Sequence, residues 1–268
     1  MKSVMWNNPF FIFHVNAFRF DPLFAQLGDD PDASAEVYAH RIIVDALIAG
    51  EDIGLAIEAM VTLTIWMHVV QNLHQSLSFC ETSADNYSFA ESAGTAVDTA
   101  LAYYVGVSQS KGRADGYLLY NLAQKSGKIF GTFNAENGEA NANTHILRLM
   151  KELKEKASQC DGSRNHVQDM RVIVGSIIKY LNVPLIQSFY YQLTVAEKTD
   201  KSSFYATLYG LATLPQVASC QPSDYYYLTH EITENGLHVA NVKNLKDTLR
   251  KTYDCFGVNC FDIHGENS

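Results

Sequence analysis

Several signatures of well-defined chemistry are missing from this sequence of 268 residues. It contains no GxSxG, GxGxxG or P-loop segment, and no HExxH pair, since "HEIT" is followed by Glu234 rather than by a histidine. These motifs position a nucleophile, nucleotide phosphates or a catalytic zinc ion. Their absence argues against a hydrolase, a kinase or a dehydrogenase, and we expect a protein that is not an enzyme.

Positive charge is also scarce. Lysine and arginine number 20 against 29 aspartates and glutamates, which gives a formal net charge of −9, and no basic cluster occurs anywhere. Nucleic acids and anionic membrane surfaces attract basic patches, so we expect neither as a partner. The acidic balance fits either the binding of cations or simple solubility.

Cysteine is present without the spacing of a zinc knuckle, because none of the five cysteines forms a CxxC pair. Cys255 and Cys260 flank a Gly/Asn turn that a disulfide can close locally. Cys160 and Cys220 lie near expected helix ends, where cross-links are common, and Cys80 is left over. We therefore predict an oxidising compartment. The alternative is five reduced thiols, with the buried ones acting as small hydrophobic residues.

The beginning of the sequence is not a good secretory signal, because Asn7, Asn8 and Pro9 interrupt the apolar core that a signal needs. We expect an exported protein that begins in this way to be a mature fragment. The triplet Asn86-Tyr87-Ser88 is an N-glycosylation acceptor and agrees with export.

The longest apolar run, residues 53–70, resembles a membrane span in composition. It contains Glu58, Thr62, Thr64 and His68. Polar and ionisable groups are costly within a bilayer, so the run is interpreted as a core helix.

Apolar residues recur with the helical period along most of the chain. The expected helices, bounded by Gly, Pro, Ser and Asn signals, lie at about 34–49, 52–79, 92–107, 116–133, 144–160, 163–180, 185–197, 200–214, 222–236 and 241–257. Pro184 is expected to break the chain between two of them. With the segments on either side of Pro184 counted as one interrupted helix, about nine helices and no strand pairs predict an all-α multi-helix bundle with no significant sheet.

We expect one helical domain over residues 1–268. It comprises an irregular segment at 1–33, a helical body at 34–253 and a cysteine-stapled tail at 254–268.

An acidic residue lies on the apolar face of the helix expected in "SAGTAVDTALAYYVG". Asp98 is three, four and seven residues before Leu101, Ala102 and Val105, which form an apolar stripe. A buried carboxylate must be paired, hydrogen-bonded or bound to a cation. Glu58 would need a partner in the same way.

The linker before residue 116 suggests an anion site. Asp115 can cap the helix that follows, and Arg113 could bind an anion together with the N-terminal amides of that helix. The alternative for Arg113 is a solvated loop residue.

Tyrosine is abundant, with fifteen residues that often occur side by side. Phenolate, carboxylate and imidazole suit ferric iron, a hard and highly charged cation that can remove the phenolic proton at neutral pH. His230 shares a helix face with Tyr226 or Tyr227, and Tyr205 shares one with Tyr209. The alternatives are tyrosines at the edge of the core and a surface histidine.

Three stretches, in order, resemble one protein family. They are "VDTALAYYVG" followed by "GYLLYNLAQKSGKIFGTF", then "VPLIQSFYYQL" followed by "FYATLYGLATLPQV", and finally "YDCFGVNCFDI". These segments are similar to the algal iron-assimilation proteins, the low-iron-inducible periplasmic proteins whose diatom members are called phytotransferrins. The similarity spans about residues 92–263.

The resemblance implies a helical protein, secreted or on the cell surface, that binds ferric iron together with carbonate for uptake. It transfers ligand roles to Asp98 and Tyr104 in the first stretch and to Tyr205 and Tyr209 in the second. A carboxylate often stands near position 205 in the family, and here the residue is Tyr205, which departs from that pattern. Tyr226 and His230 are candidate ligands from their spacing alone.

We therefore predict a ferric iron site with carbonate as a second ligand and Arg113 neutralising the anion. Attachment to a cell surface or an uptake receptor is the expected partnership. Two alternatives remain: an enzyme that acts on bicarbonate or another small anion, and a metal-free helical module whose tyrosines form a contact surface.

Overall fold

The computed structural model describes Ile43, Val44 and Leu47 and residues 53–82, 88–199, 204–233 and 241–265. The expectations for residues 1–33, for Asn86 and Tyr87 of the glycosylation triplet and for a helix end at Asn235-Gly236 lie outside these residues. Within the expected helix 34–49, the three described residues are helical.

The prediction of an all-α fold is confirmed. The described residues form helices without strands, and the nearest approach to a sheet among them is an isolated bridge between Phe133 and Ala140. The elements are α5 (Ile53–Ala59), the π-helix η1 (Met60–Ile65), α6 (Trp66–Thr82), α7 (Ser88–Val105), α8 (Leu119–Phe130), α9 (Asn141–Ser158), α10 (Arg164–Thr199), α11 (Phe204–Thr213), α12 (Pro215–Ala218), α13 (Pro222–Thr233), α14 (Val242–Lys251), the 3₁₀ helix η4 (Tyr253–Phe256) and α15 (Cys260–His264).

The chain forms two compact units. The bundle unit, as we call it, comprises residues 64–184, and the terminal unit comprises residues up to 63 together with 185–266. The chain passes between them inside helical elements, at residues 63–64 of η1 and at residues 184–185 of α10. Compact units can lie within one domain, so the expectation of a single helical domain stays a prediction.

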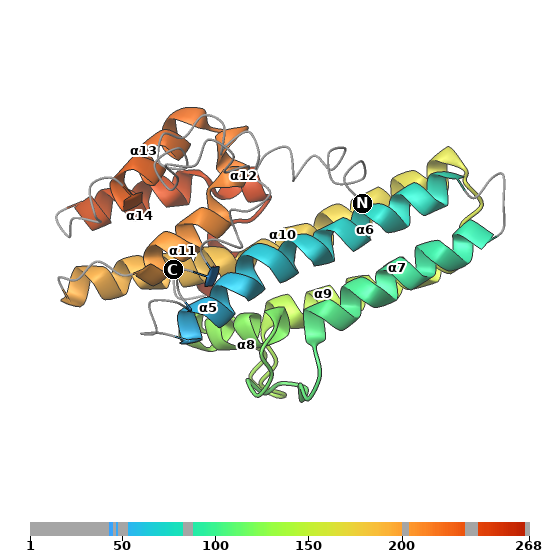
Figure 1. The fold of residues 1–268 in the computed structure, drawn as a ribbon, viewed down its shortest axis with the longest axis horizontal. Helices are drawn as coiled ribbons and strands as arrows, with labels where there is room; N and C mark the ends of the chain where they lie inside the picture. The colour runs from blue at the N-terminus through green and yellow to red at the C-terminus, as the bar shows by residue number, and fades with distance from the viewer. Residues whose placement is uncertain are drawn as a thin grey trace. The chain divides into compact units, whose positions relative to one another are not determined.

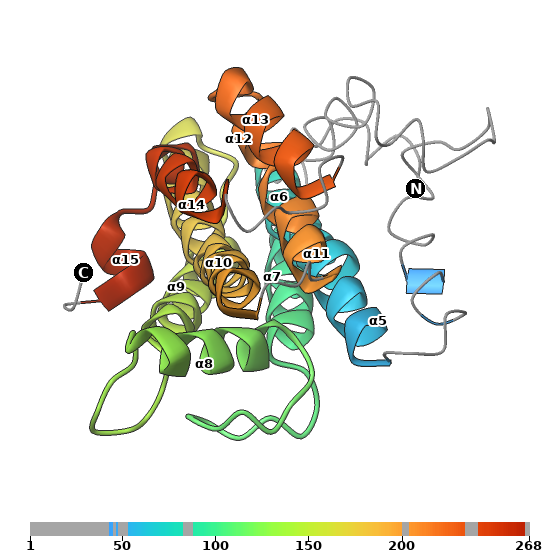
Figure 2. The ribbon, with the colours of Figure 1, turned by 90° about the vertical axis from the view of Figure 1, so that its left-hand side faces the viewer.

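In the bundle unit, α6, α7, α9 and the first part of α10 run alongside one another, and α8 crosses the end of α7 and α9 (Figures 1 and 2). The sequence of α9 explains its place, because Ile146, Met150, Leu153 and Ala157 recur at helical spacing and are buried. Its charged residues face outward, as the amphipathic pattern predicts.

In the terminal unit, α11 contacts α5, α12 and α13, and α13 contacts α14. A Cβ atom at Gly210 of α11 would overlap with Cδ1 of Ile232 on α13, so the missing side chain leaves room for Ile232 at this contact. The helix ends before Pro215, which is the first residue of α12, as the sequence predicts.

The predicted break at Pro184 is wrong, because α10 continues through it from Arg164 to Thr199. A proline within a helix removes one backbone hydrogen bond and costs about 3 kcal/mol. All nine residues from 181 to 189 are buried. The apolar surface buried by Leu181, Leu185 and Phe189 offsets that cost, since a fully buried large side chain contributes about 1.5–3 kcal/mol.

The predicted pairing of cysteines is also wrong, although two disulfides do form. Cys80 bonds to Cys160 and Cys220 bonds to Cys255, while Cys260 is a free, exposed thiol. The local closure between Cys255 and Cys260 fails because Cys255 lies in η4 with its partner at the end of α12. Each disulfide links segments distant in sequence, and two such bonds indicate an oxidising environment.

Within the part of the chain that the structure describes, two helical stretches are long and apolar enough to cross a membrane by length and composition. Their most apolar windows have mean hydropathies of 1.8 in Ile53–Thr82 and 1.4 in Arg164–Thr199. The window in Arg164–Thr199 is 72% buried, which fits a core helix, whereas the one in Ile53–Thr82 is 44% buried. The core role of residues 53–70 therefore stays a prediction.

Candidate functional site

The predicted site residues are divided between the two units. Asp98, Tyr104 and Arg113 lie in the bundle unit, and Tyr205, Tyr209, Tyr226 and His230 lie in the terminal unit. Each group is described within its own unit.

The prediction that Asp98 is buried is wrong. Its side chain is 60% exposed, and it forms an ion pair with Lys154 of α9 at 2.6 Å. The stripe of Leu101, Ala102 and Val105 lines a groove of about 500 Å³ rather than the core. A carboxylate at this position is solvated and paired with an ordinary lysine, so it needs no metal ion.

The buried face of α7 is the opposite one, where Ala93, Val97, Ala100 and Tyr104 are each at most 1% exposed. Two of these residues are alanines, which make the face look only weakly apolar in sequence. α7 packs against α6 and α9, and small side chains on a buried face are compatible with such close packing.

Tyr104 is fully buried and belongs to a polar network. Its hydroxyl donates to Oδ1 of Asn143 at 2.5 Å. Nδ2 of Asn143 donates to the carbonyl of Tyr120 and to Oε1 of Gln124, both at 3.1 Å. Burial, followed by the charges on Tyr120 and Glu139, raises the pKa of Tyr104 well above its ordinary value. The phenol is therefore held neutral within the core.

The same network holds two loops in place. Nε2 of Gln124 donates to the carbonyl of Gly112 at 3.1 Å and to that of Gly138 at 2.5 Å. The hydroxyl of Tyr120 donates to Glu139 at 2.8 Å and accepts a hydrogen bond from the Gly112 amide at 2.8 Å. These bonds join the segments before α8 and before α9, and they satisfy polar groups that are costly to bury unpaired.

Arg113 is exposed in the first of these loops. Its amide donates to the carbonyl of Ser110, and its own carbonyl accepts from Gln109. The predicted cap of the next helix is wrong, because α8 begins at Leu119 and Asp115 instead accepts from the Ser110 amide and from Gln109. The helix N-terminus is thus several residues further from Arg113 than the sequence suggested.

In the terminal unit, Tyr209 pairs with a carboxylate. Tyr209 is 3% exposed, and its hydroxyl donates to Oε2 of Glu58 at 2.5 Å. Burial, then the charge of Glu58, raises the pKa of Tyr209 well above its ordinary value, whereas a hydrogen bond with Ser188 acts in the opposite direction. Glu58 thus has a hydrogen-bond partner, as expected for a carboxylate in an apolar run, although its side chain is only half-buried.

The junction of α5 and η1 positions Glu58 for its bond with Tyr209. Glu58 lies near the end of α5, directly before the π-helix η1, and Thr62 of η1 donates to the Glu58 backbone carbonyl at 2.7 Å. Short π-helical segments often mark functional sites because they re-aim neighbouring side chains. Tyr205 is one helical turn before Tyr209 on α11, and its charge also raises the pKa of Tyr209.

The other two candidates of this unit lie on α13. The rings of Tyr226 and His230 are 6.0 Å apart between centroids, which confirms that they share a helix face. Tyr226 is 64% exposed. His230 is 4.0 Å from Oε1 of Glu231 through Nδ1. The structure thus places Glu58 and Tyr205 where each raises the pKa of Tyr209, and it pairs Tyr226 with His230 on a separate element.

The polar network of the bundle unit was not predicted from the sequence. The buried face of α8 includes, at helical spacing, Tyr120, Gln124 and Gly127. The side-chain amide of Gln124 on this face could have indicated a buried polar network. Glu139 carried no such signal, because it lies in a polar segment typical of a loop and only the fold makes it 2% exposed.

Comparison of the chain with protein-family models, with curated proteins and with solved structures gave no match. Membership of the iron-assimilation family therefore stays a prediction.

Proposed function

We propose that the chain binds ferric iron at Glu58 and Tyr209, with Tyr205 as a further oxygen ligand. The observation that carries the proposal is the hydrogen bond of 2.5 Å between the buried Tyr209 phenol and the Glu58 carboxylate. Phenolate and carboxylate oxygens are hard donors, which suit a hard trivalent ion. In this proposal Glu58 replaces Asp98 as the carboxylate ligand.

The electrostatics of the pair support the binding of a cation. Without a metal, burial and the Glu58 charge favour the protonated phenol. A trivalent ion would displace this proton and neutralise both anionic oxygens. Because iron binding then releases a proton, affinity is expected to fall as the pH falls.

Carbonate would fill the coordination positions that the chain leaves open, and its protonation on acidification would loosen the iron. Arg113 lies in the bundle unit and has no part in this version of the site. His230 remains a candidate ligand within the terminal unit. The two disulfides fit export to an oxidising environment, and we propose a secreted or cell-surface protein.

The test is a titration of the purified chain with ferric iron in bicarbonate buffer. A phenolate-to-iron charge-transfer band should appear in the visible range and fade near about pH 5. Tyr209→Phe and Glu58→Gln should each weaken iron binding by at least about tenfold. Tyr120→Phe is the matched control, because it removes an equally buried phenol from another tyrosine–glutamate pair.

The proposal fails if the wild-type protein shows no band, or if Tyr209→Phe retains it in full. A colourless protein that hydrates CO2 would favour the enzyme acting on bicarbonate. A colourless protein without that activity would favour the metal-free interaction module.

A further inference from the structure

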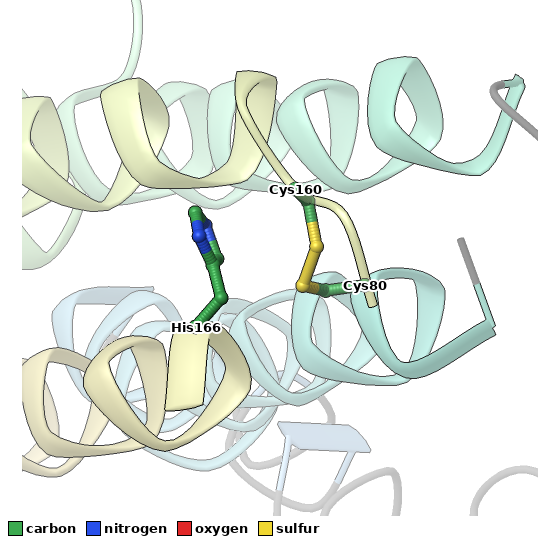
Figure 3. A group of neighbouring side chains, drawn as sticks. All are labelled: Cys80, Cys160 and His166. Carbon is green, nitrogen blue, oxygen red and sulfur yellow. A yellow bond between two sulfur atoms is a disulfide. The ribbon is translucent and has the colours of Figure 1, made fainter. Parts of the chain in front are cut away.

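One end of the bundle unit gathers three side chains that bind soft or borderline metal ions. Cys80 lies near the end of α6, Cys160 directly follows α9, and His166 lies in the first turn of α10 (Figure 3). A ring nitrogen of His166 and both sulfur atoms lie within 4.8 Å of one another. The cysteines are 0% and 8% exposed, so both sulfur atoms are shielded from solvent, whereas His166 is half-buried.

The hydrogen bonding of His166 prepares the imidazole for a ligand role. Nε2 lies 2.7 Å from the backbone carbonyl of Lys156. A carbonyl only accepts, so Nε2 donates in this bond, and in the neutral imidazole Nδ1 then holds the lone pair. Metal-binding histidines are commonly oriented by this kind of bond to a backbone carbonyl.

We infer that reduction of the Cys80–Cys160 disulfide creates a metal site, in which the two thiolates and the His166 imidazole bind a zinc-like divalent ion. A dithiol reductant would be oxidised to its own disulfide and would transfer two electrons and two protons to the cysteines. The two thiol protons are released when the ion binds, because thiolate is the ligand form. The oxidised chain cannot bind the ion in this way, since both sulfur atoms are used in the disulfide.

The geometry fits such an ion. Zinc binds sulfur at about 2.3 Å and nitrogen at about 2.0–2.1 Å, which places tetrahedral donors roughly 3.5–3.8 Å apart. The three donors already lie within 4.8 Å of one another. After reduction the sulfur atoms must separate, and the His166 nitrogen must come within the tetrahedral spacing of both. Water would take the fourth position, as in open zinc sites.

The second disulfide provides an internal contrast. Among the described residues, no third metal-binding side chain joins Cys220 and Cys255 within the same distance. A cysteine pair alone offers two donors, and reduction should therefore create a site at the first disulfide only. The inference does not depend on the ferric site, which uses oxygen donors of the terminal unit.

The experiment uses the full chain with Cys260→Ser, which removes the free exposed thiol. Zinc binding is measured by calorimetry with and without a phosphine reductant. The reduced protein should bind one zinc ion per chain and the oxidised protein none. Cobalt added to the reduced protein should give thiolate-to-cobalt charge-transfer absorption.

Two variants identify the ligands. His166→Gln keeps both thiols and should weaken zinc binding to the reduced protein by at least about tenfold. Cys80→Ser with Cys160→Ser keeps the other disulfide and should abolish reduction-dependent binding. Circular dichroism of oxidised His166→Gln checks its fold, so this variant decides the question even if the double variant does not fold. Equal zinc binding by the oxidised and reduced protein, or by His166→Gln and its parent, would overturn the inference.

Discussion

A tyrosine hydroxyl donates to a glutamate in each compact unit, and the surroundings of the two pairs differ. Tyr120 and Glu139 of the bundle unit are both 2% exposed, and their bond is 2.8 Å long. Tyr209 of the terminal unit is 3% exposed and binds Glu58 at 2.5 Å, but Glu58 is only half-buried. The two phenols are thus buried to a similar extent, whereas solvent reaches Glu58 more easily than Glu139.

The Glu139 carboxylate is compensated by groups of its own chain. It accepts from Thr144 at 3.2 Å, and Lys111 lies 3.8 Å away. Burial raises the pKa of Tyr120 to about 12, while the hydrogen bond from the Gly112 amide acts in the opposite direction. This pair joins two loops and serves the fold, whereas the proposed function has a bound ferric ion compensate Glu58. The same residue pair can thus hold a fold together or, as the proposed function has it, offer a metal site, depending on what else reaches the carboxylate.

The largest expected effect follows from breaking the network of the bundle unit. Asn143→Leu removes bonds to Tyr104, Tyr120 and Gln124 and leaves buried polar groups unsatisfied. We expect the free energy of unfolding to fall by about 3 kcal/mol, measured by urea denaturation. Arg148→Ala, which removes an exposed pair with Glu152, is the control and should change it by less than about 0.5 kcal/mol. A loss under about 1 kcal/mol for Asn143→Leu would show that this network adds little to the fold.

The next largest effect is expected when either tyrosine is replaced in iron-free protein and the free energies of unfolding are compared. Tyr120→Phe should lower the free energy of unfolding by about 2 kcal/mol, because Glu139 and the Gly112 amide each lose a buried partner. Tyr209→Phe should lower it by about 1 kcal/mol, since water can reach the half-buried Glu58. Equal losses, measured by urea denaturation, would remove the proposed difference between the pairs.

A smaller effect, on acidification, should appear in both units. Burial lowers the pKa of His74 in the bundle unit and of His264 in the terminal unit, where Arg250 adds to the shift. Above about pH 6.5 both imidazoles are neutral in the folded and unfolded chain, so they have no effect. Below it the unfolded chain binds protons first, and stability falls until the pH passes the lower folded pKa. His74→Gln and His264→Gln should each reduce the loss of melting temperature between about pH 7 and pH 5. An unchanged pH dependence in both variants would contradict this assignment.

The smallest effect is expected at the exposed pair of Asp98 and Lys154. Asp98→Asn should change the free energy of unfolding by less than about 1 kcal/mol, because solvent screens exposed ion pairs. Iron affinity should stay equal to that of the wild type. A loss of iron binding in Asp98→Asn would indicate that Asp98 of the bundle unit is the carboxylate ligand, and it would contradict the proposed site at Glu58.

The helices could be predicted because their signals are local. A few neighbouring residues are enough to predict the apolar period of α9, the helix end before Pro215 and the start of α13 at Pro222. The continuity of α10 through Pro184 could not be predicted in this way, because the compensating burial comes from residues distant in sequence.

The candidate site was predictable in part. Tyr209 was selected from a resemblance and from its spacing to Tyr205, and Glu58 was recognised as a carboxylate in an apolar run. Their pairing joins residues 151 apart in sequence. Asp98 was assigned to the wrong face, since alanines on the buried face of α7 hide which side packs against its neighbour.

The sequence by itself determined the helical class of this protein and where most helices begin and end, because backbone preferences depend on neighbouring residues. It also determined the shortage of positive charge, because net charge depends on composition. Tertiary structure alone decided which cysteines pair, which face of α7 is buried and which carboxylate meets a buried phenol. These outcomes depend on which helices touch, and contacts between distant segments leave no local pattern in the chain.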